Sequence, residues 1–250
     1  MADSEHTLLG RTALITGGAK RLGRATALAL AAEGADVVVH YRESEADARN
    51  TAAEIEKAGR RAWTLQADLA DTAQAEILIP QAIKMAGPID ILINNASIFP
   101  VDRVVDFSPN DLAMNVQIHA MSPLQLGRAF AAQNRSGDMI NFLDSRITDY
   151  DREHAAYHLS KRMLYTLTRL LAVEFAPKIK VNAVAPGLIL PPPGQDEAYL
   201  EQLKTSNPLQ RYGRAQDIAE AAVFLLRSDF ITGQVIFVDG GRHLRGRMYD

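Results

Sequence analysis

The sequence predicts an α/β protein with a doubly wound sheet of seven parallel strands, helices on both faces and a single domain over residues 1–250. Three observations lead to this fold class. Short apolar runs rich in Val and Ile alternate with longer helical patterns, as in repeated βαβ units. A glycine-rich turn joins the first apolar run to the first helical pattern. The chain length suits one large core.

The elements follow one another in regular order. Strands are expected where the chain is apolar and β-branched, at 12–16, 36–41, 61–66, 89–94, 139–143, 180–184 and 235–238. Helices are expected where apolar residues recur at helical spacing, at 22–33, 45–58, 72–85, 110–134, 154–175 and 216–227. Because parallel crossovers are almost always right-handed, this order gives a Rossmann-like sheet. Residues 186–195 interrupt the last crossover, and we expect a substrate loop there.

Composition and charge exclude several classes of function. A net charge of −3 offers no general attraction to nucleic acid or to an anionic membrane. The apolar runs are strand-length, far short of the roughly 20 residues of a spanning helix, and the N-terminus lacks the pattern of a secretory signal. The absence of cysteine excludes disulfides and thiolate metal sites. We therefore expect a cytoplasmic protein without a bound metal that acts on a small molecule.

The glycine-rich turn at 16–23 reads Thr-Gly-Gly-Ala-Lys-Arg-Leu-Gly. Glycine lets a backbone approach a pyrophosphate, and the following helix offers unpaired N–H groups and a partial positive charge. Tight turns also need glycine for steric reasons, so the position at the first βα junction is what carries the prediction. The residues predicted to bind a dinucleotide here are Gly17, Lys20, Arg21, Leu22 and Gly23.

The end of the second predicted strand indicates which dinucleotide is bound. Folds that choose NAD usually carry an acid there for the ribose 2′-hydroxyl. Here the chain instead reads His40, Tyr41 and Arg42, with Ser44 just beyond. Arg42, together with Lys20 and Arg21, supplies the charge that a 2′-phosphate requires, which predicts NADP(H). In the alternative interpretation Arg42 is a solvated surface residue. Further cofactor contacts are expected after the third and fourth strands, at Asp68, Leu69, Asn95, Ala96 and Ser97.

Tyr157 and Lys161 lie four residues apart on a predicted helix, and Asp144 precedes Tyr157 by thirteen residues. Four residues make one helical turn, so the two side chains share a face. A free phenol has a pKa near 10, and a neighbouring ammonium favours its ionised form. This spacing predicts a proton-transfer site that serves hydride transfer, with Asp144, Tyr157 and Lys161 as catalytic residues.

With these motifs the chain resembles the short-chain dehydrogenase/reductase family from about Leu8 to Leu244. The resemblance rests on the 16–23 turn, Asn94-Asn95-Ala96, Tyr157 with Lys161, Asn182, Pro186-Gly187 and the closing Val238-Asp239-Gly240-Gly241. It implies that Tyr157 donates the proton and that Lys161 holds the nicotinamide ribose and lowers the pKa of the phenol. It also implies that the nicotinamide carboxamide is touched by Pro186, Gly187, Leu188 and Ile189.

The chain departs from the common family pattern at three positions. Arg21 stands where most members have glycine, and Asp144 stands where most have a catalytic serine, with Ser145 one position away as the runner-up. His119 stands where most have a structural asparagine, four residues before Pro123. We expect His119 to be a buried, hydrogen-bonded strut rather than a catalyst.

These departures narrow the resemblance to one branch. Arg21, Ser97, Phe99 and Asp144 resemble the pteridine reductases, while His119 and residues 241–245 look more like the bacterial dihydromonapterin reductases. The resemblance implies that a pterin stacks between nicotinamide and Phe99, with hydrogen bonds to Ser97 and Arg21. Hydride would reach a ring carbon, and Tyr157, supported by Asp144, would protonate the adjacent nitrogen. Taken alone, Phe99 would more often pack in the core.

Two other functions stay open at this point. The first is a general carbonyl reductase, for instance of 3-oxoacyl thioesters, with Ser145 as the hydrogen-bond donor. The second is a non-catalytic nucleotide-sensing protein. The family resemblance also implies a homotetramer built on the helix at 156–175, and Arg242 or Arg245 would then contact substrate in a neighbouring subunit's site.

Overall fold

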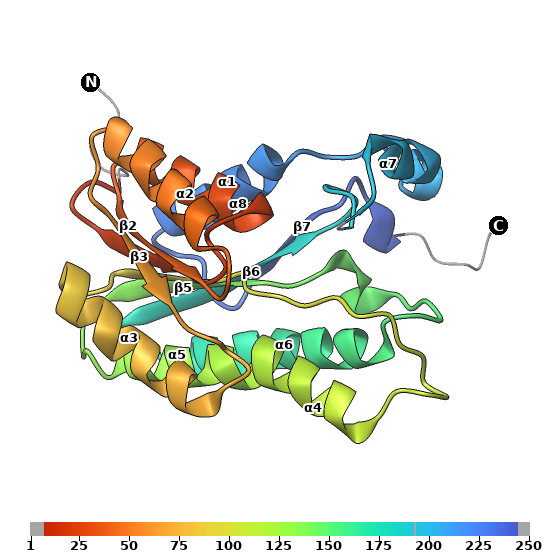
Figure 1. The fold of residues 1–250 in the computed structure, drawn as a ribbon, viewed down its shortest axis with the longest axis horizontal. Coiled ribbons are helices and arrows are strands. Elements are labelled where there is room, and N and C mark those ends of the chain that lie inside the picture. The colour runs from red at the N-terminus through yellow and green to blue at the C-terminus, as the bar shows by residue number, and fades with distance from the viewer. Residues whose placement is uncertain (1–7, 193, 245–250) are drawn as a thin grey trace.

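The computed structural model describes residues 8–192 and 194–244, and these form a seven-stranded sheet (Figure 1). The strands are β1 (Thr12–Ile15), β2 (Asp36–Tyr41), β3 (Ala62–Gln66), β4 (Ile91–Asn94), β5 (Gly137–Phe142), β6 (Ile179–Pro186) and β7 (Val235–Val238). Their spatial order is β3-β2-β1-β4-β5-β6-β7, and every neighbouring pair is parallel. The winding reverses between β1 and β4, which opens a crevice at the carboxyl ends of these strands. The predicted fold class is confirmed.

Helices cover both faces of the sheet. They are α1 (Arg21–Ala32), α2 (Glu45–Lys57), α3 (Thr72–Ala86), α4 (Pro109–Val116), α5 (Ser122–Ala131), α6 (Ala155–Glu174), α7 (Glu197–Leu203) and α8 (Ala215–Arg227). One layer contains α1, α2 and α8, and the opposite layer contains α3, α4, α5 and α6 (Figure 1). Short 3₁₀ turns at Ser145–Thr148, Lys204–Ser206 and Arg242–Leu244 complete the described secondary structure.

The single helix expected at 110–134 is interrupted. A π-helical segment, Gln117–Met121, separates α4 from α5, and α5 ends at Ala131. Pro123 has no N–H to donate to the carbonyl of residue 119, and Ser122 donates instead to the carbonyl of Gln117, five residues back. This wider turn brings His119 into a buried position.

Directly after the expected substrate loop at 186–195 the chain forms a helix that the sequence pattern did not predict. This helix, α7, begins after Asp196, whose side chain accepts a hydrogen bond from the backbone N–H of Ala198. Seven residues are too few for helical periodicity to stand out from the surrounding irregular chain. The connection between β6 and α8 therefore includes a short helix beyond the predicted loop.

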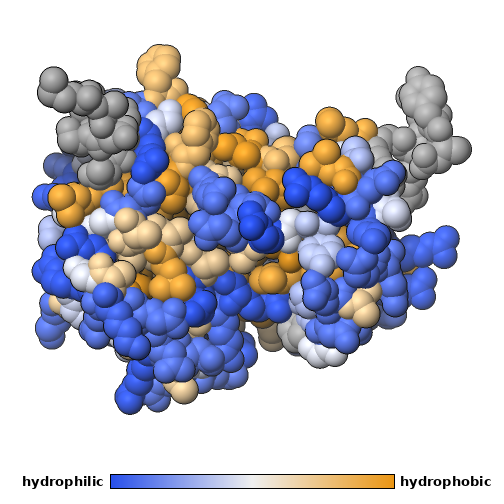
Figure 2. Space-filling model, turned by 90° about the horizontal axis from the view of Figure 1, so that it is seen from above, coloured by the Kyte–Doolittle hydropathy of each residue, from blue (hydrophilic) through white to orange (hydrophobic). Residues whose placement is uncertain are grey.

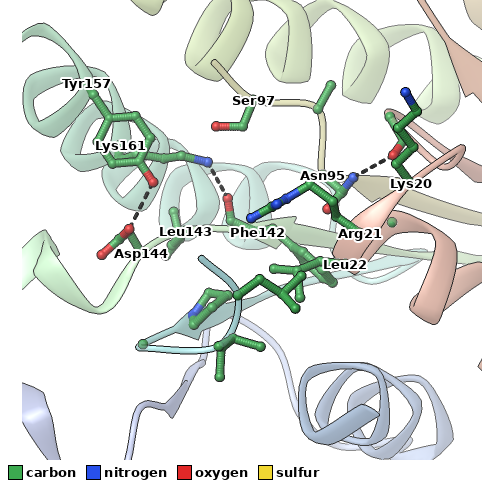
Figure 3. A pocket seen from close by; sticks show the side chains of 17 residues that line it. Lys20, Arg21, Leu22, Asn95, Ser97, Phe142, Leu143, Asp144, Tyr157 and Lys161 are labelled. Carbon is green, nitrogen blue, oxygen red and sulfur yellow. Dashed lines mark hydrogen bonds between the residues drawn. The ribbon is translucent and has the colours of Figure 1, made fainter. Parts of the chain in front are cut away.

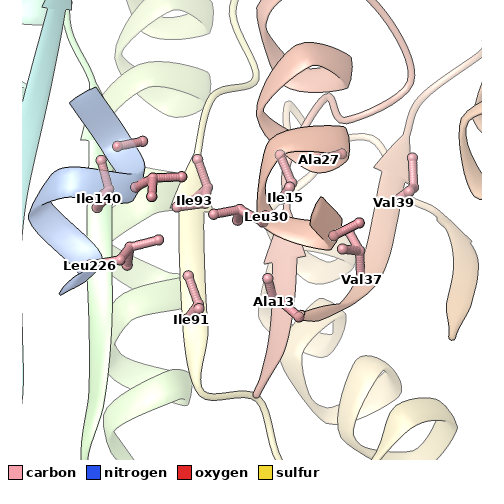
Figure 4. Close-up of a cluster of buried hydrophobic side chains, with 14 of the residues drawn as sticks. Ala13, Ile15, Ala27, Leu30, Val37, Val39, Ile91, Ile93, Ile140 and Leu226 are labelled. Atoms are coloured by element: carbon pink, nitrogen blue, oxygen red, sulfur yellow. The ribbon is translucent and has the colours of Figure 1, made fainter. Parts of the chain in front are cut away.

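The core has one large apolar cluster on each face of the sheet and a third, smaller cluster of Leu143, Leu164, Ala183 and Ala185. Along β1, Ala13 and Ile15 face the layer of α1 and α8, while Leu14 faces the layer of α3 and α5. Figure 4 shows Ile15 of β1 and Leu30 of α1 among side chains of the neighbouring strands. Strands buried on both faces form a rigid platform, and the loops at their carboxyl ends are held in place by it.

Two further findings concern the described residues as a whole. Within 8–192 and 194–244, no helix is long and apolar enough to cross a membrane, and no group of three or more His, Cys, Asp or Glu side chains has a metal-binding arrangement.

The face that carries α1, α2 and α8 exposes apolar side chains among polar ones (Figure 2). Phe224 of α8 is one of the exposed apolar residues in the chain.

Candidate active site

The glycine-rich turn places the N-terminus of α1 at the crevice. Lys20 precedes the helix without a side-chain cap, and the first turn contains no acidic residue. The first N–H groups of the helix are therefore left for an outside acceptor. A Cβ atom at Gly23 would stand 2.2 Å from the carbonyl oxygen of Gly17, so only glycine permits this close turn. The turn fits the pyrophosphate of a dinucleotide.

The loop after β4 is tied directly to this turn. The amide of Asn95 donates to the carbonyl oxygens of Thr16 and Gly17 at 2.8 and 3.0 Å. The hydroxyl of Thr16 accepts from the backbone N–H groups of Asn95 and Ala96. Four hydrogen bonds thus hold the two sides of the crevice in register, and Asn95 acts chiefly as a structural brace of the cofactor turn.

A cavity of about 250 Å³ lies between the turn and the ends of β2 and β3. Its lining includes most of the residues predicted to bind the adenosine end, namely Gly17, Lys20, His40, Tyr41, Arg42, Ser44, Asp68, Leu69, Ala96 and Ser97. It also includes five residues that the sequence did not single out, Ala19, Glu43, Ala67, Ile98 and Ile118. Lys20 pairs with Asp47 at 2.9 Å, and Arg42 pairs with Glu43 at 3.0 Å. Both cations are half-exposed and lie beside this cavity.

His40 braces the turn. Its Nδ1 accepts the backbone N–H of Gly17 at 3.0 Å, and its Nε2 lies 3.1 Å from the carbonyl oxygen of Ala67. Because Nδ1 accepts, the proton is on Nε2. Burial lowers the pKa of His40 to about 4, so the ring is neutral near pH 7. His40 therefore contributes shape to the nucleotide pocket, whereas the positive charge comes from Lys20 and Arg42.

A second cavity, of about 330 Å³, adjoins the first at the switch point. The predicted residues among its lining are Gly17, Lys20, Arg21, Leu22, Gly23, Asn95, Ala96, Ser97, Asp144, Tyr157, Lys161, Pro186, Gly187 and Ile189. Phe142, Leu143 and Leu190 also line it and were not predicted. Figure 3 shows residues from the first turn, from β5 and from α6 meeting around this cavity. We call it the catalytic cavity.

Asp144 and Tyr157 are in direct contact. The phenol Oη of Tyr157 donates to Oδ2 of Asp144 at 2.9 Å (Figure 3). Oδ1 of Asp144 accepts the backbone N–H of Arg146 at 2.8 Å. Burial, followed by the charge of Asp144, raises the pKa of Tyr157 well above 10. The phenol therefore holds its proton throughout the neutral range.

Lys161 does not acidify the phenol in this structure, contrary to the expectation from its spacing. Its Nζ donates to the carbonyl oxygen of Phe142 at 2.7 Å and lies 5.7 Å from the centre of the Tyr157 ring. Burial lowers the pKa of Lys161 to about 8, an effect that the charge of Asp144 partly opposes. The carboxylate at the phenol oxygen and the burial of the ring outweigh a more distant ammonium.

His119 is buried and hydrogen-bonded, as predicted. Its Nε2 accepts the backbone N–H of Ile98 at 3.1 Å and lies 3.0 Å from the hydroxyl oxygen of Ser97. Its Nδ1 lies 2.8 Å from Oγ of Ser160, which donates in turn to the backbone carbonyl oxygen of Tyr157. The histidine therefore links the loop after β4 to the first turns of α6.

Phe99 lies at the edge of the site rather than in the lining of the catalytic cavity. Its ring stacks on His154 with centroids 3.7 Å apart, and it meets the ring of Tyr157 edge-on at 4.7 Å. The side chain is 43% exposed, so it is not the core residue of the alternative interpretation. The stacking partner is His154, whose backbone is left-handed with φ of 60°. The sequence did not predict this pair.

Two more predicted cofactor residues lie differently from expectation. Arg21 lines the catalytic cavity and not the cavity of Arg42, and its guanidinium donates to the carbonyl oxygen of Pro191 at 2.7 Å. Its left-handed backbone, with φ of 54°, accompanies this placement, so Arg21 does not join Arg42 at the 2′-phosphate end. Leu188 lines a separate cavity beside the C-terminal segment. Neither placement is visible in a linear pattern, because both depend on loop geometry.

Arg242 lies near the catalytic residues of its own chain. The 3₁₀ turn that contains it packs against Ser145–Thr148, directly after Asp144. Burial and the nearby charge of Arg146 lower the pKa of Arg242, while Asp144 raises it. The Arg242 guanidinium therefore stands close to the active site of its own chain. Arg245 falls outside the described residues.

Comparisons with known proteins agree with this geometry. A family profile described as "Enoyl-(Acyl carrier protein) reductase" matches residues 17–243. An uncharacterised oxidoreductase of Mycobacterium tuberculosis is 38% identical over 247 residues, covering 92% of this chain and 91% of that protein. The 3-oxoacyl-[acyl-carrier-protein] reductase of Staphylococcus aureus is 32% identical over 242 residues, covering 94% of this chain and 98% of that protein.

Solved structures share this fold over nearly the whole chain. FolM Alternative dihydrofolate reductase 1 from Brucella canis, complexed with NADP, superposes with a TM-score of 0.89 at 33% identity, covering 96% of this chain and 97% of that chain. The corresponding protein from Brucella suis, also in complex with NADP, gives a TM-score of 0.91 at 33% identity, with coverage of 96% and 98%. These matches extend over almost the whole described chain.

Proposed function

This chain belongs to the short-chain dehydrogenase/reductase family, and on that premise we propose that it is an NADPH-dependent reductase of dihydropterins. It is an oxidoreductase, and its cofactor is NADP(H), as in the matching structures solved with NADP. One observation carries the pterin assignment, namely the hydrogen bond from Tyr157 to Asp144. A carboxyl group beside the phenol suits protonation of a ring nitrogen, whereas carbonyl reduction needs a hydroxyl donor for an oxyanion.

The residues of the two cavities would hold the cofactor as follows. Gly17, Gly23 and the uncapped start of α1 would receive the pyrophosphate, and Lys20 and Arg42 would attract the 2′-phosphate away from their present acidic partners. Lys161 would hold the nicotinamide ribose, as the family resemblance implies. Pro186, Gly187 and Ile189, which line the catalytic cavity, would contact the carboxamide. When bound, NADPH supplies a hydride to a ring carbon of the substrate.

The protein's own residues supply the proton. Tyr157 retains its proton because burial and Asp144 raise its pKa. To release that proton to the substrate nitrogen, the phenol needs a replacement donor, and Asp144, 2.9 Å away, is in position to be that donor once it takes up a proton. The balance is one hydride to carbon and one proton to nitrogen, and Asp144, which takes its own proton from solvent water, restores the phenol.

A specific observation also favours a carbonyl reductase as the second candidate. The relatives include a 3-oxoacyl-[acyl-carrier-protein] reductase that matches over nearly its full length. In this chain, however, that chemistry would need a hydroxyl beside Tyr157. Ser145 is only 2% exposed and is not among the residues that line the catalytic cavity. This placement supports the pterin proposal over the carbonyl alternative.

The test is the rate of NADPH consumption by purified protein with 7,8-dihydromonapterin, 7,8-dihydrobiopterin and an acetoacetyl thioester. We expect rapid turnover with at least one pterin and slow or no turnover with the thioester. Turnover of the thioester alone would overturn the proposal. Tyr157→Phe is the control in both assays, because any genuine reduction requires the phenolic proton.

The apolar outer side of α6 supports assembly into a homotetramer, as the family resemblance implies. Leu159, Met163, Leu170 and Val173 are between 40% and 80% exposed. Their spacing puts them along one side of the helix. A row of exposed apolar residues on one helix matches a self-complementary contact between two copies.

A further inference from the structure

We propose that His119 is a positioning residue that fixes the hydroxyl of Ser97 as a hydrogen-bond acceptor toward the substrate, so that the enzyme selects rings that present an N–H group there. The inference rests on the proposed pterin function and deepens it. It assigns a role to the histidine that replaces the family's usual asparagine, and it names the substrate group that this role selects.

The backbone sets the protonation of His119. The N–H of Ile98 points at Nε2 over 3.1 Å, and a backbone N–H only donates. Nε2 must therefore be the unprotonated ring nitrogen. Nδ1 then carries the proton and donates it to Oγ of Ser160 at 2.8 Å, while Ser160 donates its own proton to the carbonyl oxygen of Tyr157. In this series of hydrogen bonds, from Ile98 through His119 and Ser160 to Tyr157, every donor has one acceptor.

This tautomer of His119 fixes the direction in which the hydroxyl hydrogen of Ser97 points. The hydroxyl oxygen of Ser97 lies 3.0 Å from Nε2, and two lone pairs facing each other at that distance would repel. The hydroxyl therefore directs its hydrogen toward Nε2. This contact is also shorter than the 3.3 Å to the other nearby acceptor, the carbonyl oxygen of Ile98. The remaining lone pairs of Ser97 are therefore what the cavity receives.

Burial keeps the arrangement fixed. His119 is 1% exposed, and burial together with the charge of Lys161 holds its pKa well below the ordinary value. A protonated ring would place a hydrogen on Nε2 against the N–H of Ile98. The groups facing the ring are the Tyr157 side chain, which it meets edge-on at 5.3 Å, the hydroxyls of Ser97 and Ser160, and Lys161. Among these groups none is an acid that would favour protonation.

The consequence for the substrate follows from the position of Ser97. Ser97 lines the catalytic cavity together with Asp144 and Tyr157 (Figure 3). An acceptor-only oxygen attracts an amino or ring N–H group and repels a carbonyl oxygen. The 2-amino group of a pterin provides such a donor, whereas the 2-oxo group of the matched lumazine does not. A simple ketone, or the 3-oxoacyl end of a thioester, has no N–H beside the reacting carbonyl to offer.

The experiment compares kcat/KM for 7,8-dihydropterin and 7,8-dihydrolumazine in five proteins: wild type, Ser97→Ala, His119→Asn, the double variant of these two changes and the matched control Ser160→Ala. We expect the preference for the amino compound to fall roughly tenfold in Ser97→Ala and in His119→Asn. The double variant should lose no more than either single one. Ser160→Ala disturbs the same buried histidine from its other side, yet its preference should stay at the wild-type value.

A merely structural role would give a different result. His119→Asn would then reduce both rates by the same factor and leave the preference unchanged, which would overturn the inference. An unchanged preference in Ser97→Ala would overturn it as well, because the selecting contact would then belong to another group.

A second measurement does not depend on catalysis. In the wild-type protein with NADP⁺ bound, ¹⁵N nuclear magnetic resonance of the histidine rings should show Nδ1 of His119 protonated and Nε2 unprotonated, from about pH 5 to about pH 8. A proton on Nε2 would refute the assignment. If the wild type reduces no pteridine while this tautomer is found, the proposed function fails and the positioning of Ser97 survives. If the wild type reduces a pteridine while Nε2 of His119 carries the proton, the proposed function stands and the positioning of Ser97 fails.

Discussion

At the scale of single residues, the contact between Asp144 and Tyr157 decides which protons the site moves. The carboxylate accepts the phenolic proton at 2.9 Å in the structure, and it occupies the position from which a serine would donate. A hydroxyl at residue 144 would stabilise an oxyanion but would not return a proton to the phenol as readily as a carboxylic acid. The chemistry of the site therefore depends on this one side chain.

We predict that Asp144→Ser reverses the substrate preference. Pterin reduction should fall about 100-fold or more, because a general acid contributes at least that factor, while thioester reduction should persist or rise. The steady-state rates on both substrates measure the change. Ser145→Ala is the control and should alter neither rate much, since Ser145 is buried outside the cavity lining. An equal loss on both substrates in Asp144→Ser would contradict the prediction.

His40 predicts how stability depends on pH. Its pKa in the folded protein is about 4, against 6.5 for an ordinary histidine. Above pH 6.5 the His40 ring is neutral in both the folded and the unfolded protein, so its titration does not reduce the free energy of unfolding. As the pH falls, the unfolded chain binds a proton that the folded protein does not, so stability is lost between 6.5 and about 4. By pH 5 this loss should reach about 2 kcal/mol.

Urea unfolding at about pH 7.5 and about pH 5 tests this prediction in wild type and His40→Asn. The variant lacks the brace to Gly17 and Ala67, so it should be less stable at both values. Its further loss on acidification should nevertheless be smaller than that of the wild type by about 2 kcal/mol. If the two proteins lose the same amount, another group carries the pH dependence.

At the scale of elements, the turn before α1 and the loop after β6 are connected through Arg21. Its guanidinium donates to the carbonyl oxygen of Pro191, and its backbone takes a left-handed conformation. Glycine would relieve the strain of that conformation and raise the free energy of unfolding by about 1 kcal/mol. It would lower the free energy of unfolding by a similar amount, because glycine makes the unfolded chain more flexible. The net effect of Arg21→Gly on stability should therefore be small.

The same substitution should release the loop. We predict that Arg21→Gly speeds amide hydrogen exchange in the segment 188–204 severalfold and raises KM for the substrate, while the melting temperature changes little. Hydrogen exchange read by mass spectrometry measures the first effect. Lys20→Ala is the neighbouring control, since Lys20 pairs with Asp47 and makes no described bond to the loop. Unchanged exchange in Arg21→Gly would show that the loop is held by other contacts.

The elements also show what the sequence could and could not predict. All seven strands were located, because buried parallel strands are continuous apolar runs, although β5 begins at Gly137 and β6 runs on to Pro186. Tyr157 and Lys161 share a helix face because four residues make one turn. The π-helical turn at 117–121 was missed: it is a local adjustment around Pro123 with no periodic signal of its own.

The parts of the site that were missed depend on contacts between distant segments. The ring of His154 reaches Phe99 from the start of α6, and Arg21, whose backbone is left-handed, lines the catalytic cavity and not the cavity of Arg42. The sign of the effect on the Tyr157 pKa was also wrong, because a distance of a few ångströms decides whether Asp144 or Lys161 dominates. Linear spacing places residues at one edge of the sheet, but it does not orient them.

At the scale of the whole molecule, the exposed apolar side of α6 predicts the state of assembly. We expect light scattering after size-exclusion chromatography to give the mass of a tetramer for the wild type. Replacing Leu170 and Val173 together by Lys places charge in the proposed contact, so the mass should fall to a dimer or a monomer. Leu9→Lys changes an equally exposed apolar residue elsewhere and should leave the mass unaltered. A tetramer that survives the double change would refute assembly through α6.

The switch point between β1 and β4 has a consequence for how the chain is made on the ribosome. β1 pairs with β2 on one side and with β4 on the other, and β4 is synthesised only after residue 90. While the chain grows, the first three strands can associate, but the edge of β1, with the fully buried Ala13, Leu14 and Ile15, has no partner. A nascent chain that stalls before Ile91 therefore exposes an apolar strand edge, the kind of surface that aggregates. Release of β4 from the ribosome is the event that first protects the centre of the sheet.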